Sequence, residues 1–208
     1  MRLRTLEIAL EGLEGFRNPD PAREQYTTPA TLAARLLHHA HLLGDIEGKA
    51  VCDLGCGTGV LSCGVAILGA GRVVGVEIDP DALAIARRNA GHLGADVEFV
   101  QGDVRDRGLI EGLGAFDTVV MNPPFGAQEP HADRPFVDAA LALAPVVYGI
   151  FNTGSVTFLE AYTAGRAAIE FAIGGIFPMK RTFAFHRRDV LDIEVEIVRL
   201  ERRGTEAR

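Results

Sequence analysis

Apolar segments alternate with amphipathic segments along most of this chain, and the alternation limits its fold more than any other feature. Runs that predict strands lie at 49–54, 72–78, 97–101, 116–121 and 146–151. Runs that predict helices lie at 60–68, 80–93, 136–143 and 155–165. Strands that alternate with helices form a parallel sheet covered on both faces. The sequence therefore predicts a doubly wound α/β fold.

Both ends of the chain add to this alternation. Leucines on one side predict a helix over 3–13, and Pro29, behind the candidate cap Thr28, predicts a second helix to about Leu43. Two last strands, 167–177 and 190–200, predict a terminal hairpin. Charged and apolar residues alternate in 190–200, which is typical of a one-sided or edge strand.

The first predicted strand runs into a glycine-rich turn, "DLGCGTG", with Asp53 followed by Gly55, Gly57 and Gly59. Glycines between a strand and a helix let the backbone turn tightly and approach a nucleotide-like group. Alone the turn is a weak signal, because dinucleotide, nucleoside and purely structural turns share it. Three cysteines nearby match no zinc spacing, so we expect no metal and interpret them as small buried apolar residues.

Acidic residues follow the next two predicted strands. Glu77 ends the second strand, where a carboxylate can accept both ribose hydroxyls, and Asp79 behind it is placed to cap the helix at Pro80. Asp103 ends the third strand, where it can accept from an adenine amino group while the Val104 N–H meets the ring. No basic residue lies near the glycines, which indicates an adenosine without phosphates. S-adenosylmethionine fits that description.

The fourth predicted strand ends in "NPPF", residues 122–125. The Asn122 side-chain oxygen and the Pro123 carbonyl can each accept one N–H of an adenine amine and aim its lone pair at a methyl group. Pro123 and Pro124 hold these acceptors rigid, and Phe125 can stack on a flipped base. A purely structural Pro-Pro strand stop would be the better interpretation only if the motif stood alone.

With these motifs in place, the chain resembles archaeal relatives of methyltransferase-like protein 5, an adenine-N6 methyltransferase of small-subunit ribosomal RNA. The resemblance covers nearly the whole chain and includes "EQYTTP" (24–29), "DLGCGTGVLS" (53–62), "DPDALAIARRNA" (79–90), "FDTVVMNPPFG" (116–126) and "DIEVEIVRL" (192–200). It implies a Rossmann-like class I methyltransferase fold, with a seven-stranded, mostly parallel sheet in the order 3-2-1-4-5-7-6 and helices on both faces.

The resemblance also implies site residues and a domain organisation. The family's cofactor contacts fall on Gln25, Thr28, Gly55, Thr58, Val60, Glu77, Asp103 and Val104, and its catalytic motif on Asn122, Pro123, Pro124 and Phe125. Position 77 is Glu where the eukaryotic protein has Asp, and position 58 is Thr rather than Cys. We expect one methyltransferase domain over 1–208, with N-terminal helices and a cofactor-covering segment at 1–45 and a catalytic core at 46–208.

The charge pattern bears on the binding partners. The net charge of −7 disfavours unaided nucleic-acid binding. A basic cluster between the last two strands, which a solvated turn would explain equally well, is the predicted RNA contact and comprises Lys180, Arg181, His186, Arg187 and Arg188. The resemblance implies a small zinc-ribbon activator protein, and we expect it to pair with an edge strand at 97–101.

Two rival functions stay open at this point. A protein-glutamine N5 methyltransferase also uses an Asn-Pro-Pro motif, but typically with Tyr where this chain has Phe125. A non-catalytic S-adenosylmethionine-binding module would have no use for an intact "NPPF". No apolar run is long enough to span a bilayer and no secretory signal opens the chain, so we expect no membrane association and a cytoplasmic location.

Overall fold

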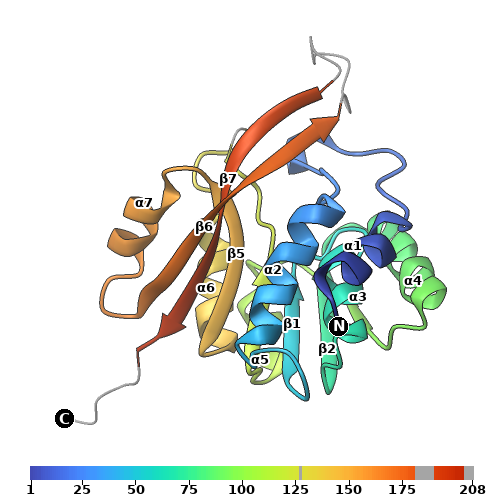
Figure 1. The fold of residues 1–208 in the computed structure, drawn as a ribbon. Helices are drawn as coiled ribbons and strands as arrows, with labels where there is room; N and C mark the ends of the chain where they lie inside the picture. The colour runs from blue at the N-terminus through green and yellow to red at the C-terminus, as the bar shows by residue number, and fades with distance from the viewer. Residues whose placement is uncertain (127, 181–189, 204–208) are drawn as a thin grey trace.

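A seven-stranded sheet forms the centre of the computed structural model, which describes residues 1–126, 128–180 and 190–203 (Figure 1). The strands are β1 (Ala50–Leu54), β2 (Arg72–Glu77), β3 (Glu98–Gln101), β4 (Thr118–Met121), β5 (Val146–Asn152), β6 (Ala167–Lys180) and β7 (Val190–Arg202). The helices are α1 (Leu3–Glu11), α2 (Ala30–Leu42), α3 (Val60–Ile67), α4 (Pro80–Leu93), α5 (Arg107–Leu113), α6 (Arg134–Leu143) and α7 (Ser155–Tyr162), with a short 3₁₀ turn, η1, at Pro21–Arg23.

The strand order is β3-β2-β1-β4-β5-β7-β6, which confirms the predicted order. Strands β1 to β5 pair in parallel, whereas β7 runs antiparallel to both β5 and β6. Because the helical connections carry the chain back to the same end of the sheet, the carboxyl ends of β1 to β5 share one edge. That edge is where loops from distant parts of the sequence meet.

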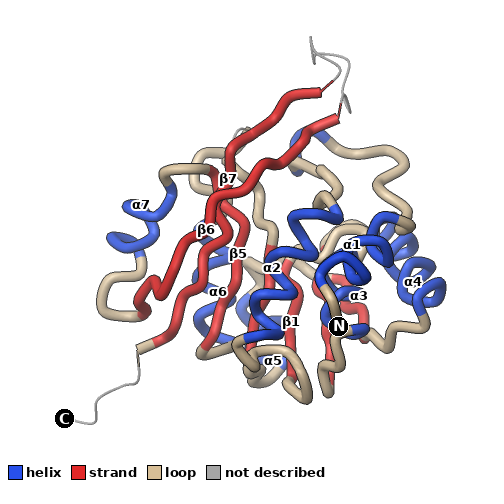
Figure 2. Tube along the Cα trace, viewed as in Figure 1, coloured by secondary structure: helices blue, strands red, loops and turns tan. Residues whose placement is uncertain are grey.

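Helices cover both faces of the sheet, as predicted (Figure 2). On one face α1, α2 and α3 pack on the sheet through a cluster that includes Leu6, Leu36 and Val65. On the other face α5, α6 and α7 pack through a second cluster that includes Ile110, Val137 and Leu159. The three cysteines are buried free thiols within these layers, which confirms their interpretation as apolar core residues. Among the residues that the structure describes, every helix is too short or too polar to cross a bilayer.

Strand β7 lies inside the sheet between β5 and β6, as the predicted order required, so of the two interpretations of its alternation, a one-sided or an edge strand, the edge strand is excluded. Its alternation has another cause. Residues 190–194 pair with β6 and extend beyond the end of β5, and Asp192 and Glu194 are exposed there. Further along, Arg199 points inward, where its Nε lies 3.1 Å from Asp45 Oδ2 and 3.1 Å from the Tyr148 hydroxyl. The charged positions therefore reflect a protruding hairpin and one ion pair below the surface.

The start of α2 also differs from the prediction. Pro29 is the residue before the first turn, and no side chain caps the helix. The Thr28 hydroxyl instead accepts a hydrogen bond from Asn122 Nδ2 at 3.0 Å. Asp79 does cap α4, since its side chain accepts from the Asp81 N–H. Thr28 of the N-terminal segment is thus hydrogen-bonded to the residue that follows β4 and does not cap its own helix.

Candidate active site

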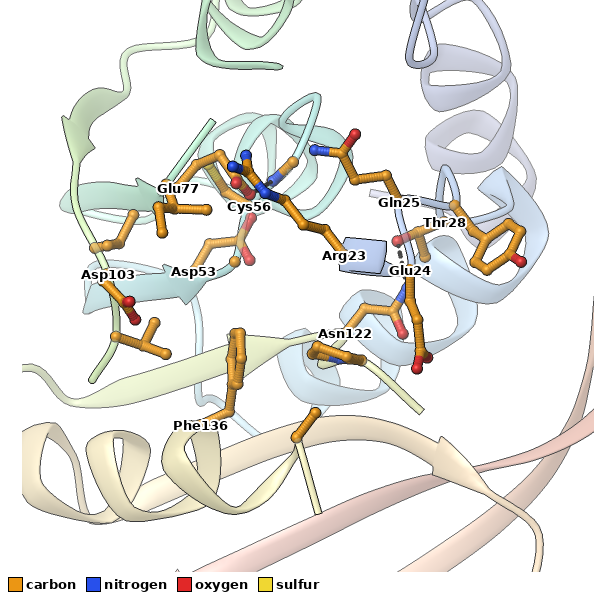
Figure 3. Close-up of a pocket in the computed structure, with 18 of the residues that line it drawn as sticks. Arg23, Glu24, Gln25, Thr28, Asp53, Cys56, Glu77, Asp103, Asn122 and Phe136 are labelled. Carbon is orange, nitrogen blue, oxygen red and sulfur yellow. Dashed lines mark hydrogen bonds between the residues drawn. The ribbon is translucent and has the colours of Figure 1, made fainter. Parts of the chain in front are cut away.

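A cleft of about 250 Å³ lies at the carboxyl ends of the parallel strands, closed on one side by the N-terminal segment (Figure 3). Its wall is made of Phe16, residues 22–28, Asp53, residues 55–58, Val60, Leu61, residues 76–78, residues 102–105, Asn122, Pro124, Glu129, His131, Ala132, Pro135 and Phe136. Most of the residues predicted to bind cofactor line this cleft. Gly59 does not, and neither do Pro123 and Phe125 of the "NPPF" motif.

The glycine turn is shaped by two aromatic rings that the sequence analysis did not identify. Gly55 and Gly57 have φ values of 69° and 54°, in the left-handed region that favours glycine. A Cβ at Gly55 would lie 2.7 Å from the Phe136 ring, and one at Gly57 would lie 2.9 Å from the Phe16 ring. Glycine is therefore required at both positions, by the backbone and by the space. No motif marks either phenylalanine, so only the tertiary structure identifies them.

Glu77 is the last residue of β2, and its carboxylate accepts hydrogen bonds from two backbone N–H groups. Its Oε2 accepts from the Gly57 N–H at 2.9 Å, and its Oε1 accepts from the Asp79 N–H at 3.0 Å. Burial raises the pKa of Glu77 although these backbone bonds favour the ionised form. Each carboxylate oxygen retains a further lone pair, so the group can still accept two hydroxyls from a ligand.

Asp53 lies beneath the glycine turn at the end of β1. Its Oδ2 accepts from the Ser62 hydroxyl at 2.5 Å, while its Oδ1 is buried and has no hydrogen-bond partner among the described residues. Burial raises the pKa of Asp53 to about 7, and the Ser62 bond opposes this only in part. A buried, unpartnered carboxylate oxygen in a cleft wall is a ready acceptor for a cationic group.

The side chains of Asp103 and Gln25 each form hydrogen bonds with other residues of the chain, which the sequence did not predict. Arg105 donates to Asp103 through its backbone N–H at 2.9 Å and its Nε at 3.1 Å. Partial burial opposes the effect, but these bonds lower the pKa of Asp103. Gln25 Nε2 donates to Asp79 Oδ2 at 2.7 Å, and Gln25 Oε1 accepts from the Asp20 N–H at 2.7 Å. Both side chains nevertheless line the cleft.

Asn122 follows β4 and lies on the other side of the cleft from Asp53, Glu77 and Asp103 (Figure 3). Its Nδ2 donates to Thr28, whereas its Oδ1 is buried and lacks a partner within the described part of the chain. Such an oxygen is costly to bury unless a ligand supplies the missing donor. The arrangement can therefore accept an N–H group from a bound molecule.

Phe125 does not belong to the cleft wall. Its ring packs edge-on against Phe177 of β6, with 5.6 Å between the ring centroids. Its stacking role stays a prediction. The basic cluster cannot be placed either, because residues 181–189 and the Lys180 side chain lie outside the described part of the structure.

A family model, a curated relative and a solved structure that match this chain are all described as methyltransferases. A family model described as "Methyltransferase small domain" matches residues 29–145. The chain is 37% identical over 211 residues to the rRNA N(6)-adenosine-methyltransferase Mettl5 of Drosophila melanogaster, covering 97% of each protein. A Pyrococcus horikoshii structure described as a candidate RNA methyltransferase is 40% identical with a TM-score of 0.88, and the match covers 97% of this chain and 98% of that one.

A more distant relative represents the rival chemistry. The release factor glutamine methyltransferase of Deinococcus radiodurans is 39% identical over 127 residues, covering 60% of this chain and 42% of that protein. The match to the Drosophila protein, by contrast, extends over nearly the whole length of both chains. The likeness to the glutamine enzyme is therefore confined to part of the molecule.

Proposed function

Because the chain belongs to the methyltransferase small domain family and, over nearly its whole length, to the Mettl5 family, we propose that it methylates the N6 atom of an adenine in small-subunit ribosomal RNA. It is a class I methyltransferase that uses S-adenosylmethionine. The RNA, the adenine and the ribosomal subunit belong to the proposal, which rests on the relatives and on the chemistry of the cleft.

The cleft suits this cofactor, which supplies a methyl group activated by a sulfonium. In the proposal Glu77 accepts hydrogen bonds from the ribose hydroxyls, and Asp53 Oδ1 accepts one from the ammonium group of the methionine part. Asp103 and the Val104 N–H form hydrogen bonds with the adenine. The unpartnered Asp53 oxygen and the two glycines whose Cβ positions are blocked support this assignment. The remaining assigned contacts are Gln25, Thr28, Gly55, Gly57, Thr58, Gly59 and Val60.

The buried, unpartnered Oδ1 of Asn122 is the observation that carries the proposal. An adenine amine is a weak nucleophile because its lone pair is delocalised into the ring. When Asn122 Oδ1 and the Pro123 carbonyl each accept one of its N–H bonds, the nitrogen becomes more tetrahedral and its lone pair can attack the methyl carbon. The proton leaves after the transfer, so no strong general base is needed in the cleft.

Nucleoside mass spectrometry tests this proposal directly. Ribosomal RNA from cells that lack the gene is separated by subunit, digested and compared with RNA from the parent strain. We expect one N6-methyladenosine to be lost from small-subunit RNA. Transfer of radiolabel from the cofactor to a glutamine-containing peptide and not to RNA would instead support the glutamine methyltransferase, and transfer to neither would support a non-catalytic module.

Glu77→Ala is expected to weaken cofactor binding by about 1.5–3 kcal/mol, the range for hydrogen bonds to a charged group. Isothermal titration calorimetry with S-adenosylmethionine measures this change. Glu98→Ala, which removes an exposed carboxylate from the neighbouring strand β3, is the matched control and should bind normally. Unchanged affinity in Glu77→Ala would move the ribose contact elsewhere, with Asp79 the next candidate.

The proposed protein partner is a small zinc-ribbon activator that adds a strand to β3. This strand lies at the edge of the sheet and begins at Glu98, one residue later than predicted. Phe99 and Val100 are half-buried, while Glu98 and Gln101 are exposed, so an added strand would pair mainly through backbone groups.

Co-expression with the zinc-ribbon protein should give a heterodimer with a higher melting temperature than the chain expressed alone. Size-exclusion chromatography and thermal melting measure the two effects. A stable, fully active monomer that gains neither mass nor melting temperature from that protein would contradict the proposed partner.

A further inference from the structure

The carboxylate of Glu24, a residue of the cleft wall, holds the backbone of the loop that follows β4. Its Oε2 accepts from the Phe125 N–H at 2.7 Å, and its Oε1 accepts from the Gln128 N–H at 2.8 Å. Both distances are in the short range for charge-assisted hydrogen bonds. The two loop residues are 101 and 104 positions away along the chain. One side chain therefore fixes two points of a loop that belongs to another part of the sequence.

Among the described residues of this loop, the backbone forms no regular secondary structure that would hold its shape. Pro123 and Pro124 have no N–H to donate, and no described residue from Asn122 to Gly126 belongs to a helix or strand. The Phe125 carbonyl accepts from Asn152 Nδ2 at 3.2 Å. Glu24 thus binds the N–H and Asn152 the carbonyl of Phe125, which directly follows the two prolines.

Glu24 adopts an unusual backbone conformation to make these contacts. Its φ and ψ are 49° and 44°, in the left-handed region that costs a non-glycine residue free energy. The conformation lets neighbouring side chains reach opposite walls, since Glu24 bonds the loop while Gln25 bonds Asp79. Thr28, four residues further along the same non-helical segment, bonds Asn122.

We propose that Glu24 is a positioning residue for methyl transfer, which holds the loop so that Asn122 and the Pro123 carbonyl meet the substrate amine in a fixed geometry. Only the last part of this inference, the contact of Asn122 and Pro123 with a substrate amine, rests on the proposed function. Loss of the carboxylate releases two backbone N–H groups and lets the loop shift. A displacement of about 1 Å in a reacting group is enough to lower a rate about a hundredfold.

The first experiment measures the loop without any substrate. Hydrogen–deuterium exchange of the cofactor-free protein is compared among wild type, Glu24→Gln and Glu24→Ala. Gln keeps the size of Glu but offers one acceptor oxygen to two donors. Glu160→Gln, at an exposed position on α7, is the control for loss of one negative charge. We expect faster exchange in peptides that cover 121–128 in both Glu24 variants, with normal exchange elsewhere.

The second experiment measures the chemical step. Single-turnover transfer at saturating cofactor and RNA should be about a hundredfold slower in Glu24→Gln, while cofactor affinity and melting temperature stay close to wild type. Unchanged exchange in 121–128 would overturn the inference, and so would faster exchange with a wild-type transfer rate. Faster exchange throughout the protein in Glu24→Ala would mean that this variant is destabilised as a whole. In that case the exchange of residues 121–128 in Glu24→Gln tests the inference.

The two experiments also separate this inference from the proposed function. If wild-type protein methylates no adenine in RNA, the proposed function fails, but the exchange measurement still shows whether Glu24 holds the loop. The transfer comparison is then repeated with the glutamine peptide as acceptor. A Glu24→Gln protein that transfers to that peptide at the wild-type rate would overturn the positioning role for either substrate.

Discussion

Asn122→Ala is expected to slow methyl transfer a hundredfold or more while cofactor affinity changes little. Removal of one preorganised polar contact to the reacting group typically costs about 10²–10³ in rate, or roughly 2.7–4 kcal/mol. The buried Oδ1 has no partner among the described residues, so the oxygen is available for the substrate amine. The measurement is single-turnover transfer to RNA at saturating cofactor, with calorimetry of the cofactor alongside.

Asn18→Ala serves as the matched control, because Asn18 is exposed and lies outside the cleft wall. It should retain the wild-type rate and affinity. An Asn122→Ala protein that loses cofactor binding but turns over normally once saturated would show that the motif has been misassigned. In that case Asn122 would belong to the cofactor site, and the acceptor for the amine would have to be sought elsewhere.

The cofactor-free protein is expected to lose stability as the pH rises from 5 to 7, because of Asp53. Burial raises the pKa of Asp53 from its ordinary value of 3.8 to about 7. The folded state therefore favours the protonated form, so this stabilisation is complete below about pH 4 and is lost as the pH rises toward 7. A pKa difference of that size corresponds to roughly 4 kcal/mol over the whole range.

Chemical denaturation at several pH values between 5 and 8 measures this effect. Asp53→Asn should have a flatter profile and be the more stable protein at pH 8, since the Ser62 hydroxyl can bond the amide as well. Asp96→Asn, an exposed carboxylate, is the control and should follow the wild-type profile. If wild type and Asp53→Asn lose stability equally, Asp53 is ionised in the folded protein and its environment is more polar than its burial implies.

Local sequence patterns were enough to predict most helices and strands and the acidic and glycine residues at the strand ends. Helix α4 was predicted at its observed bounds, Pro80–Leu93, and the other predicted elements within a few residues, whereas no bounds were predicted for α5. These features depend on local patterns, because periodicity, prolines and glycines act over a few neighbouring residues. Since parallel strands end at one edge of a sheet, the positions of Asp53, Glu77, Asp103 and Asn122 also placed them in one cleft.

The strand order followed from the resemblance to a family, and periodicity could not have supplied it. Alternation in β7 suggested a one-sided or an edge strand, and only the sheet order shows that β7 pairs on both sides. The pattern describes which residues are polar, but not whether a neighbouring strand, a helix or solvent lies beside them. Arg199 shows the difference, because it forms an ion pair below the surface with Asp45, far away in the sequence.

The contacts that join the two sides of the cleft could not be predicted from local patterns. Thr28 was predicted to cap a helix and instead bonds Asn122, while Glu24 holds Phe125 and Gln128 from the other end of the chain. Phe16 and Phe136 fill the space over the glycines without any motif to mark them. A contact between residues about 100 positions apart leaves no local signal, because it depends on how the whole chain closes around the sheet.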